Sequence, residues 1–323
     1  MQQMYIGGHD TMQYFILSFK VVFPLCFMMV FGYLVRKLDL IKESGFKMFS
    51  RTTFHIFLPV LLFVNVYKSD LANTLNIRLI AYAIISSLLL FAILCVLIPR
   101  LIKDRPDQPV VIQGIYRSNF IIFGTSIVKA IYPDADLGMV ALLAAFAVPL
   151  FNALSVLVFN MFSEDEQDLK TRFINVLKNP LIVAGALGLL FLLMKIEIPG
   201  LIFTQVENIA DLATPIALIC LGGTFRIQAL KTHTKPLLLT CIGKLILVPF
   251  FLVFIAVLLG IRGIELAAIM ALFASPVATS TFPMAQELGG NAELAGEIVV
   301  LTSIFSIATV FGWVLILSYS GLI

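Results

Sequence analysis

Long apolar runs separated by short polar segments dominate this chain. A bilayer core about 30 Å thick needs roughly 20 mostly apolar residues for each helical span. The stretch LIAYAIISSLLLFAILCVLI, residues 79–98, is apolar all round, whereas the strands of a membrane barrel alternate with polar positions. The pattern therefore predicts an all-α integral membrane protein with ten transmembrane helices. In chain order, the ten runs lie near 13–35, 46–67, 77–99, 111–131, 136–162, 180–196, 204–225, 237–260, 264–286 and 293–319.

The composition agrees with a membrane protein. Hydrophobic residues make up 60% of the 323 residues and charged residues 13%, which leaves too little polar surface for an ordinary water-soluble domain. We expect a multi-pass protein of the cell membrane, plasma or inner, surrounded by the lipid bilayer. The first run is a full span with no Lys or Arg in the dozen residues before it, so we expect no cleaved signal peptide.

The basic residues gather in alternate loops. By the positive-inside rule these loops face the cytoplasm, which predicts that both termini face outside (N-out, C-out). The loop near 287–292 contains neither Lys nor Arg and favours neither orientation. The first, third, fifth and seventh loops, with the helix ends beside them, hold 16 of the 22 basic residues: Arg36, Lys37, Lys42, Lys47, Arg51, Arg100, Lys103, Arg105, Arg117, Lys170, Arg172, Lys178, Arg226, Lys231, Lys235 and Lys244.

Proline and polar landmarks recur at a constant offset along the chain. Pro59 precedes Asn119 by 60 residues, and Pro215 precedes Pro276 by 61, so the halves superpose at an offset of 156 to 157 residues. Each half has five spans, an odd number. If the halves share a fold, the second enters the membrane from the opposite face and the repeat is inverted. Chance agreement between landmarks is the alternative.

This repeat divides the chain into three parts. We expect a first five-helix repeat at 1–162, a cytoplasmic linker at 163–179, and a second, inverted repeat at 180–323. Carriers built from inverted repeats place the substrate near the bilayer midplane, where helices are interrupted. The expected architecture therefore has broken, crossing helices in spans four and nine.

Spans four and nine both carry polar or helix-breaking residues near their middle. At this offset, residues 114–132 of span four align with residues 271–289 of span nine, and Asn119 aligns with Pro276. Proline removes a backbone donor and clashes with the preceding turn. The N–H and C=O groups that such a break exposes need hydrogen-bond partners within the protein, because lipid at the middle of the membrane supplies none. In one interpretation, helix N-termini after Asn119 and Pro276 bind an anion. The residues of this candidate site are Arg117, Ser118, Asn119, Ser275, Pro276, Val277, Thr279 and Ser280.

A second interpretation needs no ligand. Pro276 then only kinks a helix, and the hydroxyl groups donate to carbonyls one turn back, as they often do in membrane helices. Arg117 also has two interpretations. It lies roughly 10 Å inside the membrane, counted at 1.5 Å per residue, where charges are usually functional or paired. It either binds a carboxylate or snorkels to the surface, and Lys244 in span eight has the same alternatives.

Several chemistries find no candidate residues. The acidic residues lie in loops or near span ends, so the sequence offers no mid-membrane carboxylate for proton or Na⁺ coupling. The four Cys occur singly inside apolar spans, as small core hydrophobes do. Nucleophile and phosphate-binding motifs are also missing. We expect no enzyme, no cofactor, no metal site and, because the basic residues form no stripe, no nucleic-acid partner.

Three motifs together resemble the auxin efflux carrier family, a branch of the bile acid, auxin and arsenite transporter group that includes the plant PIN-formed exporters. They are YRSNFIIFG in span four, TPIALICLGGTF in span seven, and SPVATSTFPMAQELGGNAELAGEIVVLTSIFS through spans nine and ten. The resemblance implies two inverted five-helix repeats with crossovers and transport of small organic anions such as auxins, malate or malonate. One departure is Ser126, where family members often have proline.

The resemblance also implies how the helices divide. Spans 1, 2, 6 and 7 would form a scaffold, with a homodimer as the expected assembly, and spans 3–5 and 8–10 a mobile transport domain. It places the scaffold wall that faces the substrate at Leu58 and Leu62, which ordinary helix packing explains equally well. We therefore predict a secondary transporter that moves a small carboxylate by alternating access, as a uniporter or exporter. Proton- or sodium-coupled dicarboxylate uptake, and a ligand sensor with the carrier fold, are the alternatives.

Overall fold

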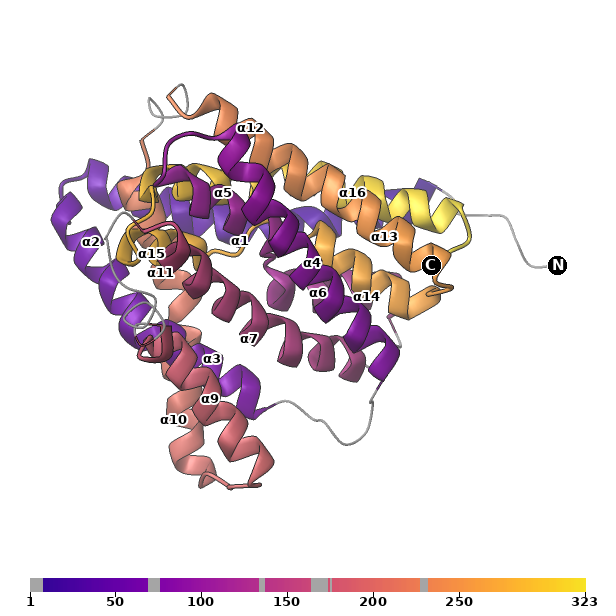
Figure 1. Cartoon of the computed structure of the whole chain (residues 1–323), viewed down its shortest axis with the longest axis horizontal. Coiled ribbons are helices and arrows are strands. Elements are labelled where there is room, and N and C mark those ends of the chain that lie inside the picture. Colours follow the sequence, from indigo (N-terminus) through magenta and orange to yellow (C-terminus); the bar gives the residue numbers. More distant parts are fainter. Residues whose placement is uncertain (1–7, 69–75, 134–136, 164–173, 175, 227–231) are drawn as a thin grey trace.

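The computed structural model describes residues 8–68, 76–133, 137–163, 174, 176–226 and 232–323, and every regular element in these residues is helical (Figure 1). Six helical stretches in this part of the chain are long and apolar enough to cross a membrane: Glu43–Tyr67, Ile77–Leu101, Gly138–Met161, Gly200–Thr224, Thr234–Leu258 and Ala292–Tyr319. The prediction of an all-helical membrane protein is therefore confirmed. The ten-span topology stays a prediction.

The first half of the chain begins with the 30-residue helix α1, which contains Pro24. The long helices α4 and α7 also contain a proline each, whereas the predicted span four is divided into α5 and α6. The elements are α1 (Gly8–Lys37), α2 (Glu43–Thr52), the π-helical segment η1 (Thr53–Phe57), α3 (Leu58–Tyr67), α4 (Ile77–Leu101), α5 (Asp107–Tyr116), α6 (Phe120–Ile131) and α7 (Gly138–Met161).

The second half begins with α9, a helix of only 14 residues that Asn179 caps by accepting a hydrogen bond from the backbone N–H of Leu181. The predicted span nine is divided into α14 and α15. The elements are α9 (Pro180–Leu193), α10 (Gly200–Asp211), α11 (Ala213–Thr224), α12 (Thr234–Ile242), the π-helical segment η3 (Gly243–Leu247), α13 (Val248–Leu258), α14 (Gly263–Ala274), α15 (Thr281–Glu287) and α16 (Ala292–Tyr319).

Both π-helical segments end two residues before a proline in the first turn of the next helix. Pro59 is the second residue of α3 and Pro249 the second residue of α13. A proline inside a helix has no N–H to donate and its ring crowds the carbonyl one turn earlier. One inserted residue, which makes a π turn, relieves that conflict without ending the helix. The two long stretches thus remain continuous across their prolines.

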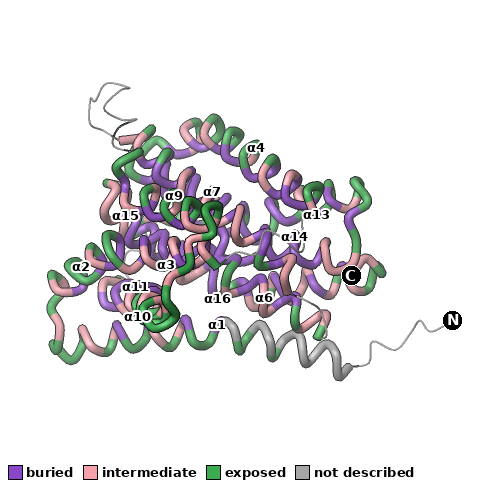
Figure 2. The backbone as a smooth tube through the Cα atoms, turned by 90° about the horizontal axis from the view of Figure 1, so that it is seen from below, coloured by how far each residue is buried: buried purple, intermediate pink, exposed green. Residues whose placement is uncertain are grey.

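The buried core runs through the interrupted helices. Every residue of α5 is buried, and so is every residue from Leu266 to Ala274 in α14. Figure 2 shows this buried region in the middle of the bundle, with exposed residues along α4 and the outer side of α1. Phe19, Phe23 and Phe27 on α1 are about half exposed and apolar, which a lipid environment favours and water does not.

Helices α1 and α11 approach each other at two glycines. A Cβ atom on Gly32 would overlap the carbonyl oxygen of Ile219, and one on Gly222 would overlap the carbonyl oxygen of Met29. Lipid tails give no hydrophobic drive between helices, so close backbone contact through small residues is a main source of helix association in membranes. These glycines therefore hold span one against span seven.

Candidate functional site

Spans four and nine are broken at the same place in the structure. After α5, the backbone of Arg117 is extended, with φ −83° and ψ 127°, and α6 begins at Phe120. After α14, Ser275 is extended, with φ −62° and ψ 149°, as a residue before proline prefers. The backbone N–H of Asn119 donates to the carbonyl of Pro276 at 2.8 Å. The first break thus supplies a backbone donor, and the second break supplies the carbonyl that accepts its hydrogen bond.

The second break extends over several residues. One interpretation of the sequence places a helix N-terminus after Pro276, and in the structure this helix, α15, begins at Thr281. Pro283 is the third residue of α15, and proline is tolerated in the first turn of a helix because the N–H groups there have no intrahelical partner. Pro276 ends one helix and Pro283 fixes where the next begins. Residues 275–280 are left as an irregular segment at the centre of the protein.

A cavity of about 110 Å³ lies beside the two breaks. Span two supplies one wall, α7 and α9 contribute to another, and the two breaks supply the polar part. Seven of the predicted site residues line it: Leu58, Leu62, Arg117, Ser118, Asn119, Thr279 and Ser280. The cavity is also lined by residues that we did not predict: Leu61, Asn65, Phe120, Ile121, Ile122, Val148, Phe151, Asn152, Leu181, Thr214 and Ala278.

Three predicted site residues lie behind the cavity and do not line it. Ser275 donates its hydroxyl proton to the carbonyl of Ala271, one turn back, as the ligand-free interpretation expected. The carbonyl of Pro276 accepts from Asn119. The backbone N–H of Val277 donates to Oγ1 of Thr302 at 3.3 Å. In this conformation these residues connect the break to its neighbours.

Arg117 is turned into the protein. Its side chain is only 4% exposed. One terminal nitrogen, Nη2, donates to Oδ1 of Asn152 at 2.8 Å and to Oγ of Ser280 at 2.7 Å. The other, Nη1, donates to Oγ of Ser155 at 2.9 Å and contacts Sδ of Met284 at 2.8 Å. All four partners are neutral, and no carboxylate of a described residue pairs with this guanidinium.

Two polar groups at the first break have no hydrogen-bond partner within the described part of the protein. They are Nδ2 of Asn119 and Oγ of Ser118, whose residues are 8% and 4% exposed. A buried polar group without a partner costs free energy, and nearly all such groups in native proteins have one. Since both residues line the cavity, a bound ligand is the natural partner for an amide donor and a hydroxyl.

Helix α7 orients the arginine, although none of its residues was among the predicted site residues. Nδ2 of Asn152 donates to the carbonyl of Val148 at 3.0 Å, which leaves Oδ1 free to accept from Arg117. Oγ of Ser155 donates to the carbonyl of Phe151 at 2.7 Å and likewise presents a lone pair. Asn152 and Ser155 are polar residues three apart in an apolar span. Residues three apart lie on the same face of a helix, and polar residues inside a span usually face the protein interior. This spacing therefore indicated that one face of span five points inward.

Lys244 lies elsewhere. It is fully buried in η3 and its Nζ has no partner among the described residues, but it does not line the cavity.

No group of three His, Cys, Asp or Glu in the described residues is placed to hold a metal ion. The four Cys are free, with Cys220 and Cys241 buried, as small core residues are.

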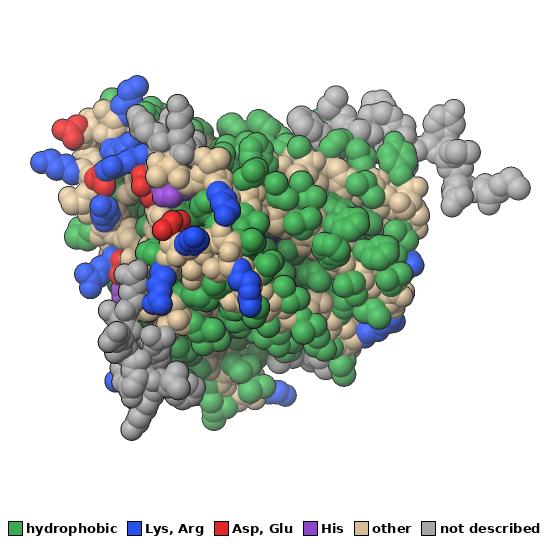
Figure 3. All heavy atoms as spheres, turned by 45° about the horizontal axis from the view of Figure 1, so that its top comes forward, with side chains coloured by type: hydrophobic (Ala, Val, Ile, Leu, Met, Phe, Trp, Pro, Cys, Tyr) green, Lys and Arg blue, Asp and Glu red, His purple; other side chains and the backbone are tan. Residues whose placement is uncertain are grey.

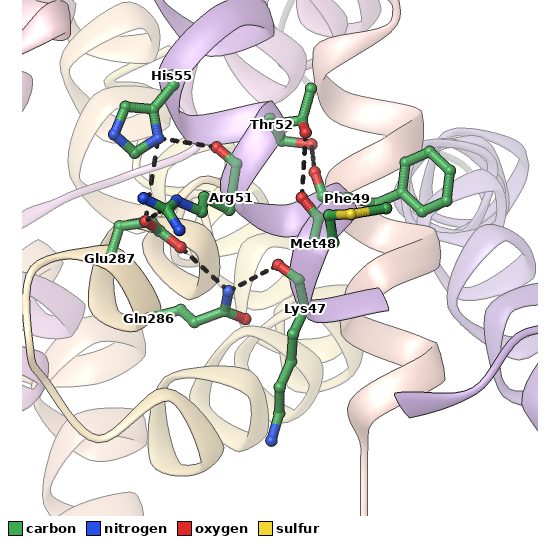
Figure 4. A network of polar contacts seen from close by, with 9 residues as sticks. Lys47, Met48, Phe49, Arg51, Thr52, His55, Gln286 and Glu287 are labelled. Atoms are coloured by element: carbon green, nitrogen blue, oxygen red, sulfur yellow. Dashed lines mark hydrogen bonds and ion pairs between the residues drawn. The ribbon is translucent and has the colours of Figure 1, made fainter. Parts of the chain in front are cut away.

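A polar network joins α2 to α15 at one end of the bundle (Figure 4). Nε2 of Gln286 donates to the carbonyl of Lys47 at 3.0 Å. The carboxylate of Glu287 lies 3.7 Å from Nε of Arg51 and 3.9 Å from Nδ1 of His55. His55 also contacts the carbonyl of Arg51 at 3.0 Å. The network connects the start of span two with the last turn of span nine.

Sequence comparison assigns the family. Residues 17–173 and 169–314 match the model of a family described as "Membrane transport protein", that of the auxin efflux carriers. This chain belongs to that family. The resemblance stated from the motifs is confirmed, and the protein is a membrane transport protein, not an enzyme.

Two curated relatives are similar to this family member. An "Uncharacterized transporter" of Methanothermobacter thermautotrophicus is 21% identical over 311 residues, which cover 93% of this chain and 98% of the relative. A "Putative malonate transporter" of Rhizobium meliloti is 28% identical over 136 residues, which cover 42% of each chain. Both names describe transporters, and the first similarity extends over nearly the whole chain.

Proposed function

We propose that this transporter is a secondary carrier for a small organic anion, a carboxylate, which binds in the cavity at the two helix breaks. The observation that carries the proposal is the environment of Arg117. A permanently charged guanidinium is buried in a membrane protein among neutral partners only. A buried charge without a counter-charge is expensive. An anionic substrate supplies that charge, and Asn119 and Ser118 complete its hydrogen bonds.

The size and polarity of the cavity support a small substrate. Its volume is about 110 Å³, below the roughly 150 Å³ of an engineered cavity that binds benzene. Arg117 is the only cation among the described residues that line it, and Leu58, Leu61 and Leu62 form an apolar side. A carboxylate of a few carbon atoms matches these dimensions. The relative named as a malonate transporter agrees with this substrate class.

The proposed architecture is that of an alternating-access carrier. Ten spans would form two inverted repeats, 1–162 and 180–323, with both termini outside and with crossovers at the breaks of spans four and nine. Helices of spans 1, 2, 6 and 7 would form a dimeric scaffold in the plasma or inner membrane, and the others would move. The α2–α15 network would then be a contact that opens when the cavity faces the cytoplasm.

Flux into proteoliposomes tests the function. Liposomes that contain the purified protein should take up a labelled small carboxylate down its gradient, and Arg117→Gln should reduce uptake at least about 10-fold, the effect of losing roughly 1.4 kcal/mol of anion binding. Arg36→Gln is the matched control, because Arg36 stacks on Tyr33 outside the cavity. Equal uptake by Arg117→Gln and wild type would contradict the proposed role of Arg117.

The same assay separates the alternatives. A uniporter or exporter responds to the substrate gradient and the voltage alone. Uptake that requires an imposed proton or Na⁺ gradient indicates coupled dicarboxylate transport. A protein that binds the labelled anion, measured by thermal shift, without moving it is a sensor with a carrier fold.

A further inference from the structure

A long apolar groove lies on the outer side of the bundle, away from the substrate cavity. Its volume is about 840 Å³, within the range of roughly 300–1,000 Å³ typical of small-molecule pockets. Helix α4 forms one side and α12, η3 and α13 the other, with Ile115 of α5 between them. The only polar side chains among the described residues that line it are those of Arg78, Tyr82 and Ser86.

The two sides of the groove are tied together near both ends. At one end, Nη2 of Arg78 donates to the carbonyl of Leu259, and the Tyr82 hydroxyl donates to the carbonyl of Leu252. At the other end, Nζ of Lys235 donates to the carbonyl of Leu101 at 2.6 Å. Between these ties α4 packs on α5 and α7, whereas α13 packs on α14. The described residues therefore leave the middle of the groove unfilled.

The end near Lys235 is strongly basic. Four basic residues are exposed at this end: Arg100 in the last turn of α4, Lys103 and Arg105 just after α4, and Lys235 in α12. None of these four cations forms an ion pair with a described residue, and Asp104 is the one acid within the 100–105 stretch. Figure 3 shows most Lys and Arg side chains of this face at one end, together with several Asp and Glu side chains, and a mainly hydrophobic surface between the two ends.

We propose that this groove binds an anionic phospholipid. One acyl chain lies between α4 and α13, and the headgroup phosphate contacts Lys235 and Arg100. An acyl chain spans half of a hydrocarbon core about 30 Å thick, and α4, at 25 residues and 1.5 Å each, is long enough to cover it. The positive-inside rule puts this basic end at the cytoplasmic leaflet, which carries the anionic lipids.

The headgroup is tested by counting lipids bound to the purified full-length protein with native mass spectrometry. Phosphatidylglycerol and phosphatidylcholine with identical chains are the probes. The wild type should retain more phosphatidylglycerol than phosphatidylcholine. Each cation removed should lower the ratio of the two retained lipids about fivefold, since a basic residue near an anionic surface contributes about 1 kcal/mol. The variant is Lys235→Gln with Arg100→Gln.

Lys37→Gln with Lys42→Gln is the matched control, because it removes the same charge from exposed residues outside the groove. Equal retention of the two lipids by wild type, or an equal loss in the control variant, overturns the proposal.

The acyl chain is tested separately at α4. Leu89 lines the groove and is 58% exposed, whereas its neighbour Leu88 is 42% exposed and lies outside the lining. Leu89→Trp should fill the groove and lower phosphatidylglycerol binding several-fold, and Leu88→Trp should leave it unchanged. Water-soluble glycerol phosphate should not compete at equal concentration. Competition by it means that a headgroup site exists without the chain, and oxidative cross-linking of Leu89→Cys between copies means that a second protein fills the groove; either result overturns the proposal.

Discussion

At the scale of single residues, the proposed substrate cavity depends on a buried cation and on two polar groups with unused hydrogen-bonding capacity. Both terminal nitrogens of Arg117 have hydrogen-bond partners, but these partners are neutral atoms. Nδ2 of Asn119 and Oγ of Ser118 have no hydrogen-bond partner in the described part of the chain. Such an arrangement costs folding free energy and is therefore expected where a ligand completes it. Stability and transport should respond differently when these groups are removed.

Asn119→Ala tests this separation. Because Nδ2 of Asn119 has no partner among the residues that the structure describes, its removal should change the free energy of unfolding by less than about 1 kcal/mol. Transport in proteoliposomes should be abolished. Asn160→Ala is the control, since Nδ2 of Asn160 donates to the carbonyl of Val156 on its own helix and the residue does not line the cavity. Wild-type flux in Asn119→Ala would remove the helix breaks from the substrate site.

At the scale of helices, prolines and glycines decide the geometry. Pro59 and Pro249 produce π turns within continuous helices, whereas Pro276 ends α14. The difference lies in what surrounds each proline. A break at Pro276 is stable because Asn119 and Thr302 provide partners for the freed backbone groups, as membrane depth requires. Sequence position alone does not distinguish a π turn from a break.

Gly222→Leu tests the packing of α1 against α11. A side chain at Gly222 would overlap the backbone of Met29, and overpacking typically costs 1–3 kcal/mol. The midpoint of thermal unfolding in detergent should fall. Gly312→Ala is the control, because no atom within 4 Å meets a Cβ at Gly312, and alanine in a helix is roughly 0.5–1 kcal/mol more favourable than glycine. An unchanged midpoint in Gly222→Leu would mean that the helices separate without cost.

At the scale of the whole molecule, charge predicts the orientation, and one helix break from each half of the chain lies beside the cavity. The basic loops predict a cytoplasmic face at the end where α4 finishes and α12 begins. The C terminus lies at the end opposite α2 (Figure 1). The two breaks come from different halves of the chain and are joined by the Asn119–Pro276 hydrogen bond. The cavity therefore exists only when both halves are folded together.

Cysteine accessibility tests the orientation. In a variant whose four native Cys are replaced, Lys103→Cys should react with a membrane-impermeant maleimide only after the cells are opened. Ser320→Cys should react on intact cells, because both termini are predicted to face outside. Both positions are exposed. Reaction of Lys103→Cys on intact cells would invert the proposed topology.

The sequence by itself determined the membrane class, the helical fold, the family and the location of both helix breaks. These properties are local. Twenty apolar residues specify a span, and proline disrupts a helix wherever it occurs. Arg117, Asn119, Leu58 and Leu62 line one cavity in the structure. The family resemblance had placed Leu58 and Leu62 on the wall that faces the substrate, and their role in binding stays a prediction.

Tertiary structure decided which groups face the cavity and what binds Arg117. Ser275, Pro276 and Val277 carry the predicted chemistry, yet they connect helices behind the cavity, whereas Asn152 and Ser155 from α7 orient the guanidinium. The long groove beside α4 was likewise absent from the predictions. A side chain's partners depend on which helices pack together over large sequence separations, and hydrophobic periodicity along one helix does not contain that information.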